Sequence, residues 1–323
     1  MTVLAVPLPG PGARLESRHR CAADAADARD LQPVVLLEDR RRIRVGVEAG
    51  SIALKSMPPC AKGRQAERPD LLPGTRPQHG SGALREAWLA EPTLRYRHGI
   101  FDRPENAASV RVLTAGGSEL RYPAPPDAVI EDRLPRLVHA WGGDAVLTVQ
   151  STIQGGAAVL LLGIVEDRLQ RLAESAPIGT PQRWLNPIGV ADFDGDGAPE
   201  VAAVVTPHIG GWLTLYRRAG DRLSIANREP GFSNHAIGTD ELRLAAMFDA
   251  NGDRVVDLAV PGADRRTLRI VTFAGGEFRE LQRIGHSAAI TSAVVGADLD
   301  ADGKYELVYA LADGTLVVLT ARR

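Results

Sequence analysis

Several features that mark other protein classes are scarce in this 323-residue sequence. It has only two cysteines, Cys21 and Cys60, too few for a multi-disulfide scaffold. Two interpretations of them stay open: one disulfide in an oxidising compartment, or two ordinary thiols. No apolar run reaches the roughly 18 residues of a membrane-spanning helix, so we expect a soluble protein with no membrane span.

An excess of one charge is also lacking. The net charge is −2, and the C-terminal two thirds carry no dense Lys/Arg face, so we expect no nucleic-acid partner. No segment of twelve or more residues keeps a helical apolar period, which argues against long helices. The N-terminal apolar stretch is broken by prolines and has no basic residue ahead of it, so it makes a poor signal peptide.

Turn-forming residues are abundant instead. The 33 glycines and 22 prolines make up about a sixth of the chain, and Gly pairs such as Gly155-Gly156 and Gly210-Gly211 separate short apolar runs. This pattern predicts β-hairpins and an all-β fold. The expected strands are Ser109–Leu113, Ala145–Val149, Ala157–Ile164, Glu200–Val205, Trp212–Tyr216, Asp257–Val260, Leu268–Phe273, Glu306–Leu311 and Thr315–Thr320.

Three acidic segments of the same pattern stand immediately before apolar strands. They read DFDGDGAPE from Asp192 (loop 1), DANGDRVVD from Asp249 (loop 2) and DLDADGKYE from Asp298 (loop 3), with starts 57 and 49 residues apart. An eroded fourth copy ends at Asp144, before the strand Ala145–Val149. Repeats of this length with three or four short strands predict a β-propeller of about five to seven four-stranded blades.

The spacing within each loop suits a hard cation. Alternating carboxylates at positions 1, 3 and 5 can point at one centre, with a backbone carbonyl at position 7 and an acidic side chain at position 9. The predicted calcium ligands are Asp192, Asp194, Asp196, Ala198 and Glu200 in loop 1, Asp249, Asn251, Asp253, Val255 and Asp257 in loop 2, and Asp298, Asp300, Asp302, Lys304 and Glu306 in loop 3. Ala198, Val255 and Lys304 would contribute their carbonyls.

Position 6 of each loop must turn sharply, which favours glycine. Loops 1 and 3 have Gly197 and Gly303 there, whereas loop 2 has Arg254, for which a left-handed conformation costs about 1–2 kcal/mol. An EF-hand is excluded because position 12 holds Ala203, Val260 and Tyr309 and not glutamate, and because strands follow the loops. The nine-residue tandems of a calcium-binding β-helix are absent.

These motifs resemble FG-GAP/VCBS repeats. The matching residues are D-x-D-G-D-G-x-x-E at 192–200, D-x-N-G-D at 249–253 and D-x-D-x-D-G at 298–303. The wider pattern resembles bacterial VCBS-repeat proteins in Glu131-Asp132-Arg133 with Pro135-Arg136-Leu137, Arg183-Trp184-Leu185-Asn186-Pro187, Pro207-His208-Ile209-Gly210 and Ser233-Asn234-His235. The resemblance covers residues 84–323 and implies an integrin-alpha-like propeller with calcium-binding blades.

The first quarter of the chain is different. Residues 1–83 contain clustered arginines and scattered prolines, with short strands expected at Val34–Leu37 and Ile43–Val47. They are either a poorly ordered leader or degenerate blade material, so we divide the chain into 1–83 and the propeller at 84–323. The terminal strand Thr315–Thr320 could pair with an N-terminal strand.

Outside the loops, the candidates for chemistry are weaker. No HxH or HxxxH pair predicts a zinc site, and no nucleophile-elbow motif supports a triad of Ser233, His235 and an aspartate. We interpret His208 and His235 as loop histidines, and His139 and Trp141 of the eroded copy as packing residues. The four tryptophans are expected to pack between blades, with a carbohydrate-stacking platform as the alternative.

We therefore predict a non-catalytic, calcium-stabilised propeller that acts as an interaction scaffold for a protein or carbohydrate ligand. The alternative is a propeller-borne hydrolase or lyase, which would need acid/base groups in the central channel; His208, His235 and a spare carboxylate meeting there would favour it. We expect a monomer. Calcium modules of this type suit a periplasmic or extracellular location.

Overall fold

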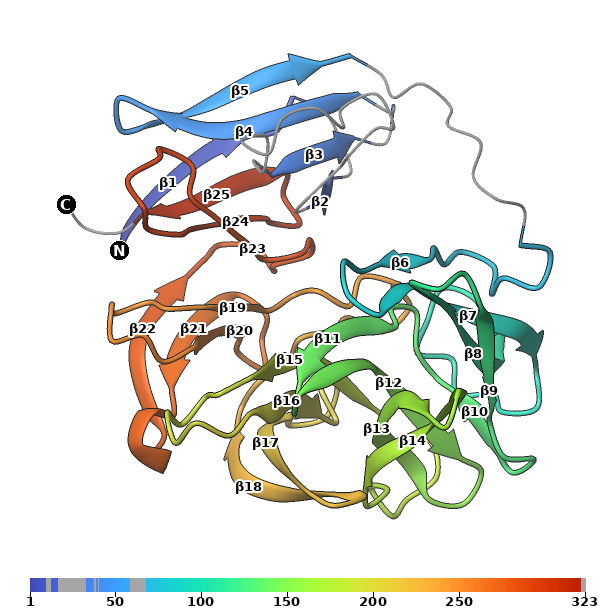
Figure 1. Cartoon of the computed structure of the whole chain (residues 1–323). Helices are drawn as coiled ribbons and strands as arrows, with labels where there is room; N and C mark the ends of the chain where they lie inside the picture. Colours follow the sequence, from blue (N-terminus) through green and yellow to red (C-terminus); the bar gives the residue numbers. More distant parts are fainter. Residues whose placement is uncertain (10–12, 17–32, 38, 40, 59–67, 321–323) are drawn as a thin grey trace. The chain divides into compact units, whose positions relative to one another are not determined.

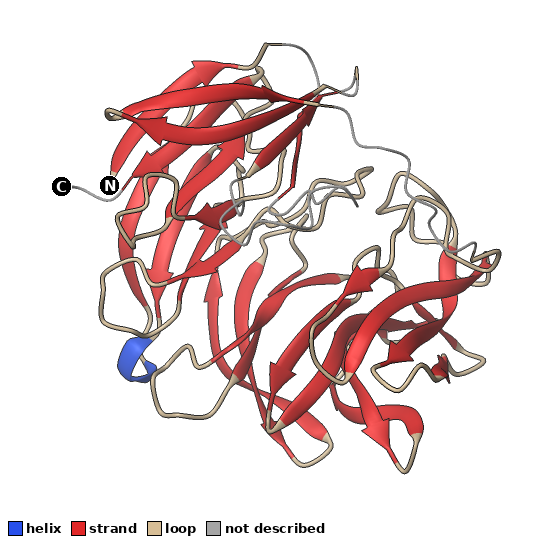
Figure 2. Ribbon diagram, turned by 45° about the horizontal axis from the view of Figure 1, so that its top comes forward, coloured by secondary structure: helices blue, strands red, loops and turns tan. Residues whose placement is uncertain are grey.

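The computed structural model describes all residues except 10–12, 17–32, 38, 40, 59–67 and 321–323 (Figure 1). Its regular structure is almost entirely β-strand, with one short 3-10 helix among the described residues, η1 (Ala274–Gly276) (Figure 2). The all-β prediction is confirmed. No described helix is long and apolar enough to cross a membrane. Cys21 and Cys60 lie outside the described residues.

Two compact units make up the chain. Unit 1 comprises residues 1–67, 243–272 and 279–323, and unit 2 comprises residues 68–242 and 273–278. The predicted division after residue 83 stays a prediction.

Unit 2 contains one continuous 13-stranded sheet built from three antiparallel meanders. The first consists of β6 (Gln78–His79), β7 (Leu84–Thr93), β8 (Asn106–Thr114) and β9 (Glu119–Pro123). The second consists of β11 (Arg136–Ala140), β12 (Gly143–Thr152), β13 (Gly156–Val165) and β14 (Arg168–Ser175). The third consists of β15 (Leu185–Ala191), β16 (Glu200–Val205), β17 (Trp212–Ala219) and β18 (Arg222–Pro230).

Short pairings join these meanders. The strand β10 (Ala128–Ile130) pairs with both β8 and β12, and β14 runs parallel to β18 over two residue pairs, Glu174 with Arg222 and Ser175 with Leu223. Two buried apolar clusters fill the unit, one around Leu147, Trp184 and Val201 and the other around Leu89, Val110 and Leu160.

Unit 1 contains three separate four-stranded sheets. One consists of β2 (Ala13–Glu16), β3 (Val34–Leu37), β4 (Arg42–Glu48) and β5 (Ser51–Met57). Another consists of β19 (Ala246–Phe248), β20 (Asp257–Pro261), β21 (Thr267–Thr272) and β22 (Arg279–Gly285). The last consists of β23 (Val295–Ala297), β24 (Glu306–Ala310), β25 (Thr315–Thr320) and the N-terminal strand β1 (Thr2–Pro7).

The N-terminal part of the chain therefore contributes strands to unit 1. Both strands predicted there are present, as β3 and within β4. The predicted pairing of Thr315–Thr320 with an N-terminal strand is also confirmed, because β1 runs antiparallel to β25 from Thr2 opposite Thr320 to Pro7 opposite Thr315. This pairing covers an edge of β25 that would otherwise expose unpaired backbone groups.

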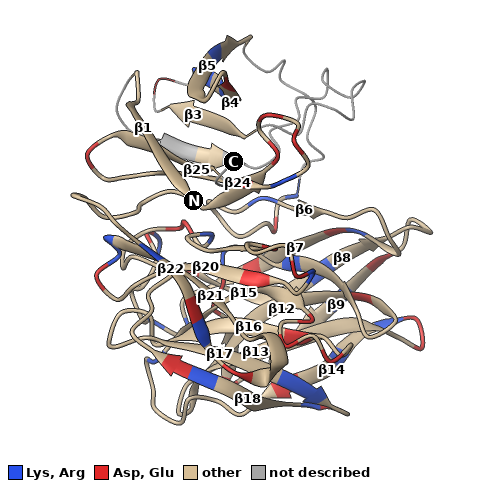
Figure 3. Cartoon of the chain, turned by 90° about the vertical axis from the view of Figure 1, so that its left-hand side faces the viewer, with Lys and Arg blue, Asp and Glu red and all other residues tan. Residues whose placement is uncertain are grey.

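Each four-stranded antiparallel meander has the organisation of a propeller blade. The described strands form six of them, three in each unit, which agrees with the predicted five to seven. Inner strands such as β16 and β24 are buried along their whole length, and outer strands such as β18 alternate exposed and covered residues. In Figure 3 the ribbon of β18 is coloured at both basic and acidic residues.

Candidate metal sites

All three acidic loops occupy the same place in their sheets. Each joins the first strand of a meander to the second: loop 1 lies between β15 and β16, loop 2 between β19 and β20, and loop 3 between β23 and β24. The acidic residue at position 9 is the first residue of the second strand in every case. The prediction that each loop leads directly into a strand is confirmed.

The loops also share a backbone conformation. Positions 4 and 6 have positive φ in each: Gly195 and Gly197 in loop 1, Gly252 and Arg254 in loop 2, Ala301 and Gly303 in loop 3. Arg254 has a φ of 68°, so the predicted left-handed arginine is present and carries the expected strain. Loop 3 also has a strained position, which the sequence analysis did not single out: Ala301 at 61°.

Backbone amides hold the carboxylates in a repeated pattern. The position 1 aspartate accepts a hydrogen bond from the amide of position 6 at 2.9–3.0 Å in every loop. The position 5 aspartate accepts one from the amide of position 7 at 2.8–2.9 Å. The position 9 carboxylate accepts one from the amide of position 2 at 2.8–3.1 Å. The side chains are thus oriented by the chain itself, as a preformed ion site requires.

The position 9 carboxylates are buried. Glu200 and Asp257 are 0% exposed and Glu306 is 1% exposed. Burial raises the pKa of each of these three carboxyl groups, because a charge removed from water is destabilised. The neighbouring aspartates of the same loop act in the same direction. A cation bound at the loop would remove this penalty.

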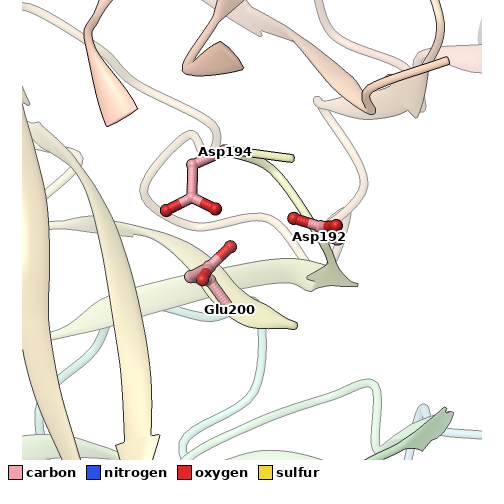
Figure 4. A group of neighbouring side chains, drawn as sticks. All are labelled: Asp192, Asp194 and Glu200. Atoms are coloured by element: carbon pink, nitrogen blue, oxygen red, sulfur yellow. The ribbon is translucent and has the colours of Figure 1, made fainter. Parts of the chain in front are cut away.

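Two of the loops gather three carboxylates closely enough to share an ion. In loop 1, Asp192, Asp194 and Glu200 each offer an oxygen, and these oxygens lie within 4.8 Å of one another (Figure 4). In loop 3 the group consists of Asp298, Asp300 and Asp302, so the third carboxylate comes from position 5 and not from position 9. These two clusters could hold a metal ion, and their donors are all oxygens, which suits calcium or magnesium.

Loop 2 is arranged differently. Its position 3 residue is Asn251, whose side-chain amide donates a hydrogen bond to Asp253 Oδ2 at 2.9 Å. The amide Oδ1 accepts from the backbone of Asp253 at 2.8 Å. One oxygen of Asp253 is therefore engaged by a hydrogen bond within its own loop, and the loop has one carboxylate fewer than loops 1 and 3.

Loop 1 has a basic neighbour that the sequence reasoning did not single out. Arg217, on β17, lies opposite Glu200 in the β16–β17 register. Its Nη2 is 2.5 Å from Asp194 Oδ2, 2.9 Å from Asp196 Oδ2 and 2.7 Å from Glu200 Oε1. The hydrogen bond to Glu200 raises the pKa of Arg217 further above its already high value.

The eroded fourth copy has become a β-turn between β11 and β12. Asp144 pairs with His139 at 2.7 Å and also accepts from the Leu84 amide at 3.2 Å. The side chain of His139 is 76% exposed, so its interpretation as a packing residue is wrong; it instead pairs with the acid at the turn. Trp141 does pack, against the cluster around Trp184.

The histidines that raised the enzyme alternative lie next to each other in unit 2. His208 Nε2 is 2.8 Å from His235 Nδ1, and His235 Nε2 donates to the Thr239 carbonyl at 2.9 Å. His235 is fully buried, and the His208 ring stacks on Trp184. Both ring nitrogens of His235 are used in hydrogen bonds, so the pair is built into the packing.

A buried polar network was also missed. Glu131 and Asp132 are fully buried although no local sequence pattern requires it. Glu131 is 2.9 Å from His98 Nδ1, and its backbone carbonyl accepts a hydrogen bond from the indole of Trp184 at 2.8 Å. Asp132 accepts from the Thr148 hydroxyl at 3.0 Å. The only sequence signal was their place in the motifs that resemble VCBS-repeat proteins.

Comparison with known proteins gives distant likenesses. No protein-family model and no curated protein match the sequence. A chain in the crystal structure of BBS1N in complex with ARL6DN matches over 90% of this chain and 87% of its own, with 12% identity and a TM-score of 0.44. The rhamnogalacturonan lyase YesW matches over 64% of this chain and 49% of its own, with 15% identity and a TM-score of 0.40.

Both likenesses are too remote to carry an argument. The propeller-like organisation rests on the strand pairing described above, and the candidate sites rest on their own geometry.

Proposed function

We propose that this chain is a non-catalytic FG-GAP/VCBS-type propeller whose acidic loops bind calcium, and that it serves as a scaffold for a protein or carbohydrate ligand. One observation carries the calcium part: the buried carboxylate that closes each loop. Glu200, Asp257 and Glu306 begin inner strands, so a charge at each position is held under the loop at the start of the strand. Burying such a charge is costly unless a cation or hydrogen bonds compensate it.

Calcium fits these loops better than magnesium does. Their oxygens come from an irregular turn with two left-handed residues, and calcium accepts six to eight oxygens in irregular geometry, whereas magnesium demands a near-ideal octahedron. The unfolded chain has no such site, so calcium binding would add directly to folding stability. The role we assign to calcium is therefore structural.

The scaffold interpretation is favoured over an enzyme by the histidine pair. General acid/base catalysis needs a titratable group that can reach a substrate. His235 is buried with both ring nitrogens engaged, one by His208 and the other by the Thr239 carbonyl. The resemblance to VCBS-repeat proteins and the weak affinity typical of extracellular calcium modules support a periplasmic or extracellular location.

Thermal unfolding tests the calcium proposal. The protein is stripped of metal, and its thermal unfolding is measured in EDTA, in about 1 mM calcium and in about 1 mM magnesium. We expect calcium to raise the melting temperature and magnesium to raise it much less. Equal melting curves in EDTA and calcium would refute it. Calcium at about 100 times its Kd contributes about 2.7 kcal/mol per site.

A separate assay tests the non-catalytic assignment. The protein is incubated with a panel of neutral and uronic-acid polysaccharides, and new reducing ends and unsaturated products are measured. We expect neither to form. Turnover that disappears in a variant of the half-buried His208, His208→Ala, with an unchanged melting curve would establish the enzyme alternative instead.

A further inference from the structure

The three loops differ in the residue that faces the buried carboxylate from the next strand. Glu200 lies opposite Arg217 in the β16–β17 register. Leu258 pairs with Val271, and Leu307 pairs with Leu319, so the positions corresponding to Arg217 are Thr272 for loop 2 and Thr320 for loop 3. A cationic side chain therefore stands at this position only in loop 1.

Arg217 occupies the place that a bound metal ion would take among the carboxylates of loop 1. One nitrogen, Nη2, lies within 2.9 Å of carboxylate oxygens from Asp194, Asp196 and Glu200, at positions 3, 5 and 9 of the loop. Two of these residues, Asp194 and Glu200, also belong to the carboxylate cluster that could hold a metal. A calcium ion and this guanidinium would therefore use the same oxygens.

Loop 3 has open space in the corresponding region. A cavity of about 250 Å³ is lined by Asp300, Asp302, Glu306 and Thr320, the same loop positions that Arg217 contacts in loop 1 together with the threonine that replaces it. Glu306 is 1% exposed, and its carboxylate accepts one hydrogen bond, from the Leu299 amide. Thr320 carries no charge, so it cannot compensate these carboxylates as Arg217 does in loop 1.

We propose that Arg217 is a built-in counter-cation that competes with calcium at loop 1 and weakens calcium binding there. This inference rests on the proposed calcium role of the loops. The sequence ranks loop 1 as the fullest copy of the motif, and the arginine lowers the calcium affinity expected from that rank. Loop 1 keeps part of its charge balance without calcium, because the arginine belongs to the fold.

Calcium titration calorimetry of metal-stripped protein tests this proposal. The informative variant is Arg217→Thr, which gives loop 1 the residue found at the corresponding position of the other loops. The matched control is Arg218→Thr, which removes the neighbouring positive charge; Arg218 contacts the Gly220 carbonyl and the Trp141 ring and is not part of the loop. We expect Arg217→Thr to strengthen calcium binding at one site at least tenfold and Arg218→Thr to leave binding unchanged.

Assignment of the gained site uses a second substitution and a second measurement. Adding Asp194→Asn to Arg217→Thr should abolish the gain. In melting experiments, Arg217→Thr should have a lower melting temperature than the wild type in EDTA. In calcium its melting temperature should equal that of the wild type. If Arg217 were only a structural ion-pair partner, the loss in EDTA would persist in calcium, and this result would overturn the proposal.

The reciprocal variant, Thr320→Arg, keeps the test decisive if Arg217→Thr does not fold. An arginine at this position should weaken calcium binding at loop 3 at least tenfold and raise the melting temperature in EDTA. Unchanged binding in Thr320→Arg would overturn the competition argument while leaving the calcium proposal intact. Absence of calcium binding in the wild type and in every variant would overturn both.

Discussion

The effect of the substitution Glu306→Gln on stability should have one sign without calcium and the opposite sign with calcium bound. Glu306 is buried beneath loop 3. Its burial raises its pKa, and the carboxylates of Asp298, Asp300 and Asp302 raise the pKa further. Glutamine has the same shape and keeps an acceptor for the Leu299 amide, which now donates to the carboxylate at 2.8 Å. Without metal, the substitution removes a buried charge that forms no ion pair with the cationic side chains of the described residues, and it should therefore stabilise the protein.

The magnitude follows from the exposure of the loop. The three aspartates of loop 3 lie in a loop that is largely exposed, so water screens their repulsion and the gain is about 1–2 kcal/mol. In saturating calcium, at about 1,000 times the Kd, the wild type gains about 4 kcal/mol that the variant cannot fully obtain. The net effect in calcium is a loss of about 2–3 kcal/mol. For a chain of this size, 1 kcal/mol corresponds to about 2 °C in melting temperature.

Parallel melting curves in EDTA and in calcium measure both effects. The melting temperature of Glu306→Gln should rise by about 2–4 °C in EDTA and fall by about 4–6 °C in calcium. The control is Glu200→Gln in loop 1, where Arg217 partly compensates the charge at 2.7 Å; it should raise the melting temperature in EDTA by less than Glu306→Gln does. If Glu306→Gln lowers the melting temperature equally in both buffers, the charged carboxylate stabilises the protein without calcium and the reasoning fails.

Two further predictions concern the stability of the fold. A Cβ on Gly211 would come within 1.7 Å of the Phe232 carbonyl oxygen, so Gly211→Ala should cost about 3 kcal/mol in denaturant unfolding. Gly210→Ala, in open space but at a φ of 74°, should cost only about 1–2 kcal/mol. Burial lowers the pKa of His286, whose Nε2 is 2.8 Å from the Tyr309 hydroxyl. The unfolded chain therefore binds the proton more readily, and stability should fall as the pH drops below about 6.5. His286→Gln should flatten this part of the stability profile; an unchanged profile would contradict the assignment.

The strands that sequence alone located are those that lie inside the sheets. Glu200–Val205 and Thr315–Thr320 were predicted with the bounds that the structure has, because an inner strand covered on both faces is a continuous apolar run. The outer strands β14, β18 and β22 were missed. Their residues alternate between covered and exposed, and many are charged, so local sequence does not distinguish them from turns.

For the candidate site, sequence predicted the loops, their entry into strands and the strained Arg254, because all of these depend on residues within nine positions of one another. The cationic neighbour of loop 1 depends on strand register. Arg217 could have been located from the predicted strands Glu200–Val205 and Trp212–Tyr216, since pairing Val205 with Trp212 places residue 217 opposite residue 200. Without the pairing, it is one of many surface arginines.

The sequence by itself thus determined an all-β chain with three graded acidic loops, because turn residues and alternating carboxylates are local features. Only the tertiary structure decided what surrounds each loop. Strand pairing brings Arg217 to loop 1 and leaves Thr320 beside loop 3, and it joins β1 to β25, the two strands nearest the ends of the chain. These contacts join distant residues, and their energies depend on burial and charge that arise only when the strands pair.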